Sequence, residues 1–540
     1  MCGIYSILSY YNKSLLYDHA ANSHSKELSD RGPDDYKYYK DSYIHMDFYR
    51  LAINGVSNGK QPMIYKHYVL ICNGEIYNHK ELEKLIGYTP NTESDCEIIL
   101  PLFEKYGIEQ TCILLDGVFA FVIWDNHNYV LHSARDRFGV RPLYYSILDG
   151  VIQISSEMKG MYLSLDMVVE HFPPGQYLTL HSKQFGFMTK FTSYYNYAWN
   201  ENKFLKNNYT SVLSSIQFYL HEAVRKRLMT ERPIGCLLSG GLDSSLIAGL
   251  VRKYLPKEKQ LRTFSIGFEG SPDLKYARKV ADFLKTDHHE FLVTPQEFLD
   301  NIDTVIKVTE TFDITTIRAS VGNYLVCKKI KEYNQTQDVD NQSIVIFNGD
   351  GADEVAGGYL YHRNAPSGLD FHLESVSLLK EIHNFDVLRS DRCCSDNGLE
   401  PRTPFLDRDF VNLYMSIPIE YRFDNNKQEK YLIREAFREE NIIPDEVLFR
   451  KKEAFSDGVS VKEKSWWQII QEYLEYKIAL PEINEGYPFY STCLTKEAYY
   501  YYKKFSAMYK NQIKVIPHYW LPKWSGNVIN PSARVLTNYK

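Results

Sequence analysis

The sequence predicts an α+β domain followed by an α/β domain with a doubly wound parallel sheet and a helical C-terminal part. The chain has 540 residues, more than one hydrophobic core usually supports, so at least two domains are expected. Residues 1–185 contain short apolar runs separated by turn signals, a pattern typical of stacked sheets covered by helices. From residue 213 on, apolar strands alternate with amphipathic helices, and helical patterns dominate after about residue 370.

Hairpins are the main feature expected in residues 1–185. An apolar run over residues 68–72 ends at Asn73 and Gly74, which is a strong turn signal. Helical spacing is present in residues 80–86 and 95–106. The segments that predict two further hairpins are residues 117–124, 128–133, 142–145 and 151–155.

Residues 183–208 are polar and aromatic without a clear period, which indicates a linker. After the linker, Ser211 is a candidate N-cap of an amphipathic helix. Strands are then predicted at residues 236–238, 261–268, 289–293 and 343–347, and helices at residues 243–251 and 273–284. Because ligands bind at the carboxyl ends of parallel strands, we expect the loops at Ser239, Ile266 and Asn348 to share one rim. The polar stretch 332–342 is expected to form a surface loop.

The glycine turn after the first of these strands is a candidate phosphate site. It reads Ser-Gly-Gly-Leu-Asp-Ser-Ser over residues 239–245, between a strand and a helix. Such a turn aims backbone N–H groups and the positive end of a helix dipole, about half a charge, at one point. Its hydroxyls can bind phosphate oxygens, and Asp243 can hold Mg²⁺. The alternative is an ordinary strand-to-helix turn. Without Gly-Lys-Ser/Thr, the segment is not a Walker A sequence.

A second candidate site lies at the N-terminus, where Cys2 follows the initiator methionine. Trimming of Met1 would leave Cys2 with a free α-amino group, and a pKa of about 7.7–8.0 allows such an amine to act as a base. The amine and the thiol that it would activate belong to one residue, so no separate triad is needed. A cysteine at position 2 is by itself usually incidental.

Further motifs accompany Cys2. They are Arg-Gly-Pro-Asp at 31–34, Arg-Leu-Ala-Ile-Asn at 50–54, Asn-Gly-Glu-Ile-Tyr at 73–77 and Ser-Asp at 94–95. With them, the first part of the chain closely resembles the class II, or N-terminal nucleophile, glutamine amidotransferases. The resemblance implies a four-layered αββα sandwich. It also implies that Cys2 attacks the glutamine side-chain amide and forms a glutamyl thioester.

The same resemblance implies a role for each residue of a glutamine site. The Asn73 side chain and the Gly74 N–H would form an oxyanion hole, an effect often worth a few kcal/mol. Arg50 would clamp the glutamine α-carboxylate, and Asp95 and Glu75 would lie around its α-ammonium group. The backbone that would line the pocket belongs to Leu51, Ala52, Ile53 and Asn54. Taken singly, the plain alternatives are a surface charge for Arg50, a turn for Asn73 and Gly74, and a helix N-cap for Asp95.

The turn at residues 239–245 resembles the PP-loop of ATP pyrophosphatases, which cleave ATP between the α- and β-phosphates. Nearly end to end, the chain resembles the family of glutamine-hydrolysing asparagine synthetases. The resemblance implies a glutaminase domain over residues 2–185 and a PP-loop synthetase domain over residues 213–540. Besides the two motifs, it rests on residues 271–274, 309–320, 349–354, 385–389, 404–407, 452–458 and 531–540.

This resemblance also implies an ATP site. Adenosine would contact Leu238, Ile266, Asn348 and Gly349. The phosphates would contact Ser239, Gly240, Gly241, Asp243, Ser244 and Ser245. Mg²⁺ would be bound by Asp243 and Asp353, and the phosphates would be neutralised by Arg318 and Lys452. Asp350 would act in forming or using β-aspartyl-AMP. Spacing alone favours a solvated charge for Lys452.

The chain departs from the family pattern at two places. The usual Ser-Gly-Glu-Gly is replaced by Asn348, Gly349, Asp350 and Gly351, so the acid is one methylene shorter while its charge is kept. The family's Glu-x-Arg-Val-Pro-Phe-Leu-Asp reads Glu-Pro-Arg-Thr-Pro-Phe-Leu-Asp over residues 400–407, and the ring of Pro401 fixes φ beside Glu400.

The expected reaction is the ATP-dependent conversion of L-aspartate to L-asparagine with ammonia released from L-glutamine at Cys2. AMP, pyrophosphate and L-glutamate would be the other products. Ammonia must be shielded from water, which implies a closed route between the domains. Two alternatives stay open. A relative such as a β-lactam synthetase would use the adenylate differently but would not need Cys2. A degenerate binding protein that keeps the fold would need neither activity.

Bulk properties limit the expected partners to small molecules. The net charge of −6 gives no reason to expect nucleic acid or an anionic membrane, and no apolar run reaches the roughly 18 residues that span a bilayer. The N-terminus lacks the basic region of a signal peptide. Nine cysteines without a Cys-x-x-Cys motif argue against a disulfide framework and a zinc site, so a cytoplasmic location is expected. The family resemblance suggests a homodimer.

Overall fold

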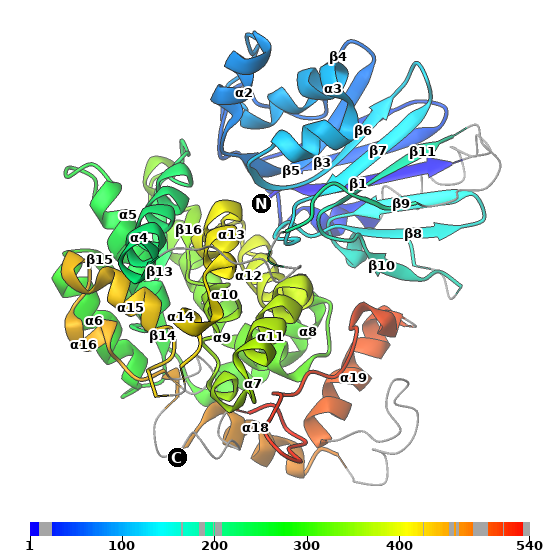
Figure 1. Cartoon of the computed structure of the whole chain (residues 1–540). Coiled ribbons are helices and arrows are strands. Elements are labelled where there is room, and N and C mark those ends of the chain that lie inside the picture. The colour runs from blue at the N-terminus through cyan, green and yellow to red at the C-terminus, as the bar shows by residue number, and fades with distance from the viewer. Residues whose placement is uncertain are drawn as a thin grey trace.

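The computed structural model describes residues 1–9, 24–163, 166–182, 190–197, 199, 208–424, 426–452, 458–460, 464–478, 495–510 and 512–532. It shows two halves in contact, the first built on two sheets and the second on a third (Figure 1). The N-terminus lies where the halves meet (Figure 1). Most of the expected linker and of the motifs at residues 452–458 and 531–540 lie outside the described residues.

Both sheets of the first half are six-stranded and antiparallel. The first sheet runs, in spatial order, β10 (Val169–His171), β8 (Tyr144–Leu148), β9 (Val151–Ser155), β1 (Gly3–Ser9), β3 (Ile44–Arg50) and β2 (Asp35–Lys40). The second runs β12 (Thr192–Ser193), β11 (Gln176–His181), β7 (Val130–Arg135), β6 (Gly117–Asp125), β5 (Tyr68–Ile76) and β4 (Met63–Tyr65). The hairpins predicted around residues 117–133 and 142–155 are confirmed as β6–β7 and β8–β9.

An apolar core fills the space between these two sheets, with Ile4 and Met46 from one side and Ile71 and Val122 from the other. Helices α2 (His79–Ile86) and α3 (Ile99–Leu114), with the 3-10 turn η2 (Asp95–Ile98), cover the second sheet. The outer face of the first sheet packs against the turns η1 (Ser25–Leu28) and η3 (Met158–Gly160) and against the second half. Residues 10–23 lie outside the description, so a complete helical layer on this face stays a prediction.

The turn predicted at Asn73 and Gly74 is wrong. Strand β5 continues through both residues, which pair with Ala120 and Phe119 of β6. A Cβ on Gly74 would lie only 2.5 Å from the Val118 carbonyl oxygen. The glycine therefore permits a close approach of two strands rather than a reversal of the chain.

Helix α4 (Tyr209–Lys226) follows the expected linker and buries the predicted apolar stripe against α13 (Arg408–Ser416) and α15 (Tyr431–Phe437). Its N-cap is Asn208 and not Ser211, because the Asn208 side chain accepts a hydrogen bond from the Ser211 N–H at 2.9 Å. The cap thus lies three residues before the position that the sequence pattern favoured.

The third sheet is five-stranded and parallel, as predicted, in the order β15 (Asp287–Leu292), β14 (Arg262–Gly267), β13 (Ile234–Leu237), β16 (Val345–Phe347) and β17 (Glu400–Arg402). The chain order reverses between β13 and β16, and ligands bind at such a switch point in doubly wound sheets. Strand β17 was not predicted from the sequence. It accepts Pro401 because it is an edge strand, where a missing N–H leaves no ladder bond unmade.

Helices surround this sheet, as Figure 1 shows. The expected loop at residues 332–342 begins within α9, which extends to Asn334, and includes the turn η5 (Val339–Asn341). The remaining helices of the second half are α5 (Leu242–Tyr254), α6 (Pro272–Leu284), α7 (Pro295–Asp300), α8 (Ile302–Thr309), α9 (Ile314–Asn334), α10 (Ala352–Ala356), α11 (Gly368–Glu381), α12 (Asp386–Ser395), α14 (Ile419–Arg422), α16 (Asp445–Leu448), α18 (Trp466–Glu475) and α19 (Lys496–Tyr509).

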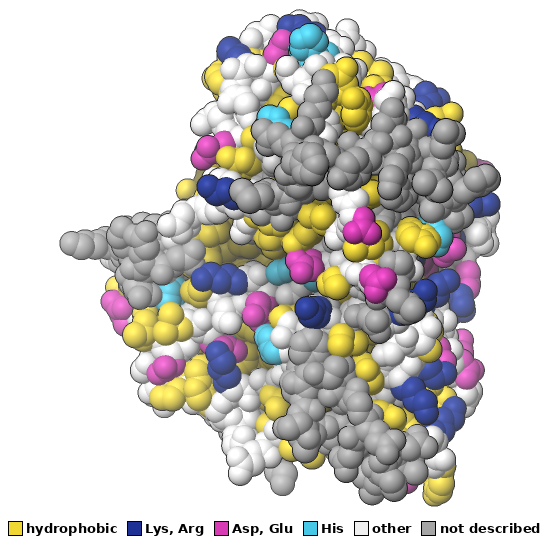
Figure 2. Space-filling view, turned by 90° about the vertical axis from the view of Figure 1, so that its right-hand side faces the viewer, with side chains coloured by type: hydrophobic (Ala, Val, Ile, Leu, Met, Phe, Trp, Pro, Cys, Tyr) yellow, Lys and Arg dark blue, Asp and Glu magenta, His cyan; other side chains and the backbone are white. Residues whose placement is uncertain are grey.

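Acidic and basic side chains are interspersed with hydrophobic ones on the face shown in Figure 2. Among the described residues, none of the helices combines the length and the apolar character that a membrane span requires.

Candidate active sites

Cys2 lies at the start of β1, beside the strand that carries Asn73. The Cys2 backbone N–H donates to the Asn73 side-chain oxygen at 3.1 Å, and the Cys2 thiol lies 3.6 Å from the Leu51 carbonyl oxygen. The Asn73 amide nitrogen is buried and has no hydrogen-bond partner among the described residues. A buried donor without a partner is costly, so it is suited to an oxygen that a ligand would bring.

The loop after β3 forms the other wall of this site. Arg50 donates to the carbonyl oxygens of Gly55 at 2.6 Å and Val56 at 3.1 Å. The Asn54 amide donates to Glu75 at 2.5 Å and lies 3.4 Å from an oxygen of Asp95. The structure therefore brings together the residues that the sequence nominated for glutamine, from the end of β3, from β5 and from the start of η2.

Burial dominates the electrostatics of the first site. It raises the pKa of the Cys2 thiol to about 11, despite the nearby N-terminal charge. It also raises the pKa values of Glu75 and Asp95, and the charges of Glu400 and Asp95 raise that of Glu75 further. The thiol in this chain, which still carries Met1, is therefore protonated at neutral pH and needs a base to become a nucleophile.

Glu231 of the second half supports the loop after β3 that contains Gly55 and Val56. This contact was not predicted from the sequence. Its carboxylate accepts hydrogen bonds from the backbone N–H of Gly55 at 2.5 Å and of Val56 at 3.3 Å. Its own N–H donates to the Ile53 carbonyl at 3.1 Å. Residue 231 lies between α4 and β13, far from the loop in sequence, so only the fold shows this contact.

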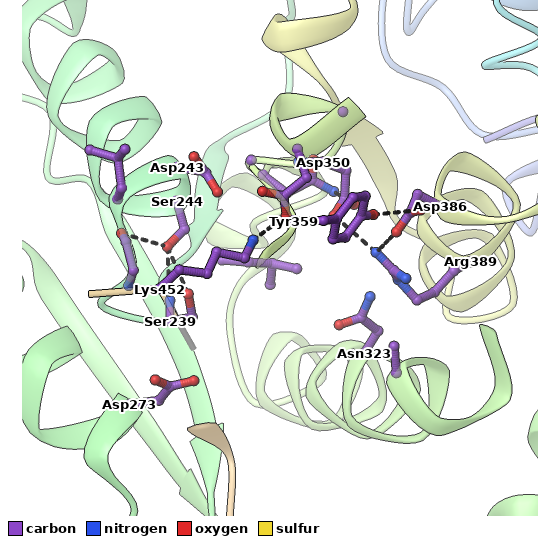
Figure 3. Close-up of a pocket in the computed structure, with 18 of the residues that line it drawn as sticks. Ser239, Asp243, Ser244, Asp273, Asn323, Asp350, Tyr359, Asp386, Arg389 and Lys452 are labelled. Atoms are coloured by element: carbon purple, nitrogen blue, oxygen red, sulfur yellow. Dashed lines mark hydrogen bonds and ion pairs between the residues drawn. The ribbon is translucent and has the colours of Figure 1, made fainter. Parts of the chain in front are cut away.

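A second site lies at the switch point of the parallel sheet. Figure 3 shows Ser239, Asp243 and Ser244 on one side of this pocket, Asp350, Asp386 and Arg389 on the other, and Lys452 reaching between them. Of the residues predicted for ATP and Mg²⁺, Gly240 and Ser245 do not line it. Those that line it are Leu238, Ser239, Gly241, Asp243, Ser244, Ile266, Arg318, Asn348, Gly349, Asp353 and Lys452.

The turn at residues 239–245 is held in shape by its own hydroxyls. The Ser239 N–H donates to the Ser244 hydroxyl at 3.1 Å, and the two hydroxyls lie 2.9 Å apart. Gly240 has φ +70°, and a Cβ there would lie 2.4 Å from the backbone nitrogen of Ala277. Only glycine fits, and the first turn of α5 is thereby aimed into the pocket.

Lys430 joins the two predicted magnesium ligands. Its ammonium group lies 2.5 Å from a carboxylate oxygen of Asp243 and 2.5 Å from one of Asp353, and Lys452 also contacts Asp353. Burial opposes ionisation of Asp353, but the charges of Lys430 and Lys452 outweigh it and lower its pKa. Sequence reasoning missed Lys430 because charged residues alternate throughout that segment.

The carboxylates of Asp243 and Asp353 fit a magnesium ion that also binds phosphates. They face one buried ammonium group, and the second oxygen of Asp243 is buried without a hydrogen-bond partner in the described part of the chain. Within the same part, three or more metal-ligating side chains do not cluster. Mg²⁺ is usually held by one or two carboxylates and by substrate phosphates, which suits this pair.

The far side of the pocket holds side chains of both charges. Arg389 contacts Asp386 and lies 3.6 Å from Asp350. Burial raises the pKa of Asp350, and Arg389 opposes that shift.

The Arg318 guanidinium, predicted to bind phosphate, donates to Glu497 of α19 at 2.7 Å and to the side-chain oxygen of Asn530 at 3.1 Å.

Known families match both halves. Residues 1–195 match a glutamine amidotransferase domain, and residues 216–375 and 365–532 match asparagine synthase. The glutamine-hydrolyzing asparagine synthetase of Cricetulus griseus is 43% identical over 545 residues, which cover 95% of each chain. Those of Homo sapiens and Gallus gallus are each 42% identical, again over 95% of each chain. The chain belongs to the asparagine synthetase family.

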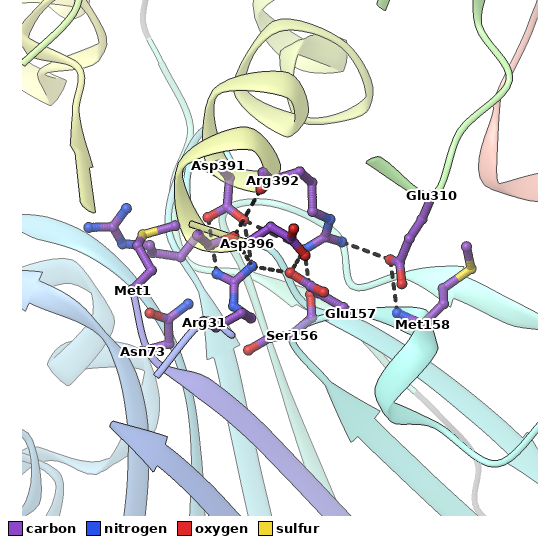
Figure 4. Close-up of polar contacts among 12 residues, drawn as sticks. Met1, Arg31, Asn73, Ser156, Glu157, Met158, Glu310, Asp391, Arg392 and Asp396 are labelled. Atoms are coloured by element: carbon purple, nitrogen blue, oxygen red, sulfur yellow. Dashed lines mark hydrogen bonds and ion pairs between the residues drawn. The ribbon is translucent and has the colours of Figure 1, made fainter. Parts of the chain in front are cut away.

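In this member of the asparagine synthetase family, buried ion pairs join the two halves (Figure 4). Arg31 donates to the Cys2 carbonyl at 3.0 Å and to Asp391 of α12 at 2.7 Å, and it also contacts Glu157. Arg392, the next residue of α12, lies 3.1 Å from Glu157. The glutaminase-like half is thus anchored to the helix that also carries Arg389.

A second buried cluster joins the glutamine site to β17. Arg402 lies 3.3 Å from Glu75 and donates to Glu400 at 2.7 Å. Arg141 lies 3.5 Å from the other oxygen of Glu400. Glu400, whose placement the neighbouring Pro401 left open, therefore lies inside the interface. Arg402 was not predicted as a site residue, because a three-residue strand is too short for a period to be seen.

Proposed function

We propose that the protein makes L-asparagine from L-aspartate, ATP and the amide nitrogen of L-glutamine. AMP, pyrophosphate and L-glutamate are the other products. The observation that carries this function is that Cys2, next to the free amide donor of Asn73, adjoins the half that holds a phosphate-type pocket. An amide needs an activated acid and a nitrogen, and this family member has a site for each.

In the first step, the Cys2 thiolate attacks the glutamine side-chain carbonyl after its proton passes to the α-amino group exposed by loss of Met1. The Asn73 amide and the Gly74 N–H stabilise the oxyanion, and ammonia leaves as the thioester forms. Arg50 binds the glutamine α-carboxylate, while Asp95 and Glu75 bind its ammonium group. Water then releases glutamate and restores the thiol.

In the second step, the aspartate side-chain carboxylate attacks the α-phosphorus of ATP, and the bond to the β-phosphate oxygen breaks. Leu238, Ile266 and the backbone of residues 348–349 hold the adenosine, and the turn at residues 239–245 holds the phosphates. Asp243 and Asp353 would hold Mg²⁺, which would neutralise charge on the pyrophosphate. Lys430 and Lys452, which lie against these carboxylates, add positive charge where pyrophosphate leaves.

Aspartate binds on the far side of the pocket, where Arg389 and Asp386 face Asp350. The guanidinium suits the α-carboxylate of the substrate and Asp386 suits its ammonium group. Asp350 lies beside them and is placed to assist the reaction of β-aspartyl-AMP with ammonia. The chemistry of the pocket therefore favours a small amino acid rather than a larger acceptor.

The glutaminase domain spans residues 2–185, with an αββα sandwich, and the synthetase domain spans residues 213–540. Ammonia crosses where they meet, since Cys2 adjoins elements of the second half through Arg31. A cytoplasmic location follows from the cysteine pattern, and the partners are small molecules and a second copy of the chain. Sedimentation at micromolar concentration tests the dimer.

The deciding experiment supplies Mg·ATP and aspartate with either glutamine or ammonia and measures asparagine, AMP and pyrophosphate. Cys2→Ala should abolish asparagine formation from glutamine and leave formation from ammonia unchanged. Cys112→Ala, a buried thiol of α3 outside both sites, is the matched control. Equal loss of both activities in Cys2→Ala would overturn the assigned division of labour. No asparagine from either nitrogen source would overturn the function itself.

A further inference from the structure

The loop between β16 and α10 contains a contact that no family role assigns. The Asn348 side-chain nitrogen donates to a carboxylate oxygen of Asp350 at 2.8 Å and to the Ser390 hydroxyl at 2.7 Å. In return, the Asp350 N–H donates to the Asn348 side-chain oxygen at 3.3 Å. Asn348 thus closes a small ring around the acid, and both hydrogens of its amide are used.

The backbone of Asn348 is itself fixed. Its N–H donates to the Arg402 carbonyl of β17 at 3.1 Å, and its side chain is almost completely buried, with 4% exposed. The opposite oxygen of Asp350 lies 3.6 Å from Arg389. The carboxylate is therefore held from two sides, by an amide on its own loop and by a guanidinium on α12.

Within this loop, the same two positions differ from the Ser-Gly-Glu-Gly of the family that the sequence resembles, which has serine and glutamate there. A serine hydroxyl has a single hydrogen and is shorter than an asparagine amide, so it could not donate to Asp350 and Ser390 together. In this chain, the longer side chain at position 348 thus occurs together with the shorter acid at position 350. The two altered residues, Asn348 and Asp350, are therefore joined by a hydrogen bond.

We propose that Asn348 is a positioning residue that compensates for the shortened acid by holding the Asp350 carboxylate toward the bound aspartate. The proposal rests on the proposed function, because Asp350 matters only if an aspartyl adenylate is formed and used. It adds a specific claim, which is that residues 348 and 350 function as a matched pair in this chain and that neither is replaceable alone.

The test is a double-mutant cycle of Asn348→Ser, Asp350→Glu and both together, assayed with ammonia as the nitrogen source. Each single variant should lower kcat by about tenfold or more with little change in the KM for ATP, and the double variant should recover most of the loss. Glutaminase activity of all three should match the parent, which shows that the chain has folded.

A matched control is Asn323→Ser combined with Asp350→Glu. Asn323 lines the same pocket (Figure 3), but it lies on α9 and not on the Asn348 loop. This pair should show no recovery over Asp350→Glu alone. Multiplicative losses in the Asn348→Ser and Asp350→Glu pair, or a full kcat in Asn348→Ser, would overturn the proposal while the parent stays active. A parent that forms no asparagine would overturn both the proposal and the function.

Discussion

Lys430→Gln is the most direct test of the charge arrangement at the second site. The lysine is 1% exposed and lies 2.5 Å from each of two carboxylates. Removing one partner of a buried ion pair costs about 3–5 kcal/mol, because a buried charge is left uncompensated. Among the described residues, Lys452 would remain as the ion-pair partner of Asp353, and Asp243 would lose its contact with Lys430.

If about 3 kcal/mol of this stabilisation is lost in the transition state for pyrophosphate release, kcat/KM for ATP should fall roughly a hundredfold, at 1.36 kcal/mol per factor of ten. The assay is pyrophosphate release with aspartate and ammonia. Glutaminase activity, measured as glutamate formed from glutamine, should be unchanged because the Cys2 site lies in the other half. Lys427→Gln is the matched control, since that lysine is 45% exposed and pairs only at 3.7 Å with Asp424 among the ion pairs of the described residues. A fall of less than about threefold in Lys430→Gln would refute the reasoning.

Two further outcomes are expected in the first half. A chain that keeps Met1 as its first residue should be alkylated at Cys2 about a hundredfold more slowly at pH 8 than an ordinary thiol. Burial raises the thiol pKa from 9.0 to about 11, and the thiolate is lost as the pH falls below that value. Peptide mapping by mass spectrometry measures this, and equal rates would contradict it. Glu231→Ala should raise the KM for glutamine several-fold and leave ammonia-dependent synthesis unchanged. The reason is that the loop beside Arg50 loses the hydrogen bond from the Gly55 N–H to the Glu231 carboxylate. A change in the ammonia-dependent rate alone would contradict a role of Glu231 in supporting that loop.

The sequence predicted the parallel sheet and the three loops at its rim, because strand-to-loop order is a local pattern and the rim follows from a general rule of such sheets. It failed at Asn73 and Gly74, where a local turn signal was outweighed by pairing of β5 with β6 along their whole length. Pairing with a distant strand determined the backbone conformation at these residues, as it often does where the local preference comes from only one or two residues.

The missed site residues share one physical feature, which is that their partners are distant in sequence. Lys430 meets Asp243 across 187 positions, and Glu231 meets Gly55 across 176. No periodicity or spacing encodes such contacts, and a charged side chain in a polar segment is usually solvated. Cys2 and Asp350 were nominated because each belongs to a short motif that resembles the corresponding motif of a known family.

The burial of Met1 limits the time during which this residue can be removed from the growing chain. Met1 is 0% exposed, and its amino group donates to the carbonyl of Leu399 at 3.2 Å. If Cys2 acts through its own α-amino group, Met1 has to be removed, and a peptidase needs a free chain end to do so. Removal would then have to precede the synthesis and docking of Leu399. Ribosomes add about 5–20 residues per second, so roughly 20–80 s separate these two residues at the exit tunnel. Under the proposed function, a chain that keeps Met1 beyond this interval would fold without the amino group that activates its thiol.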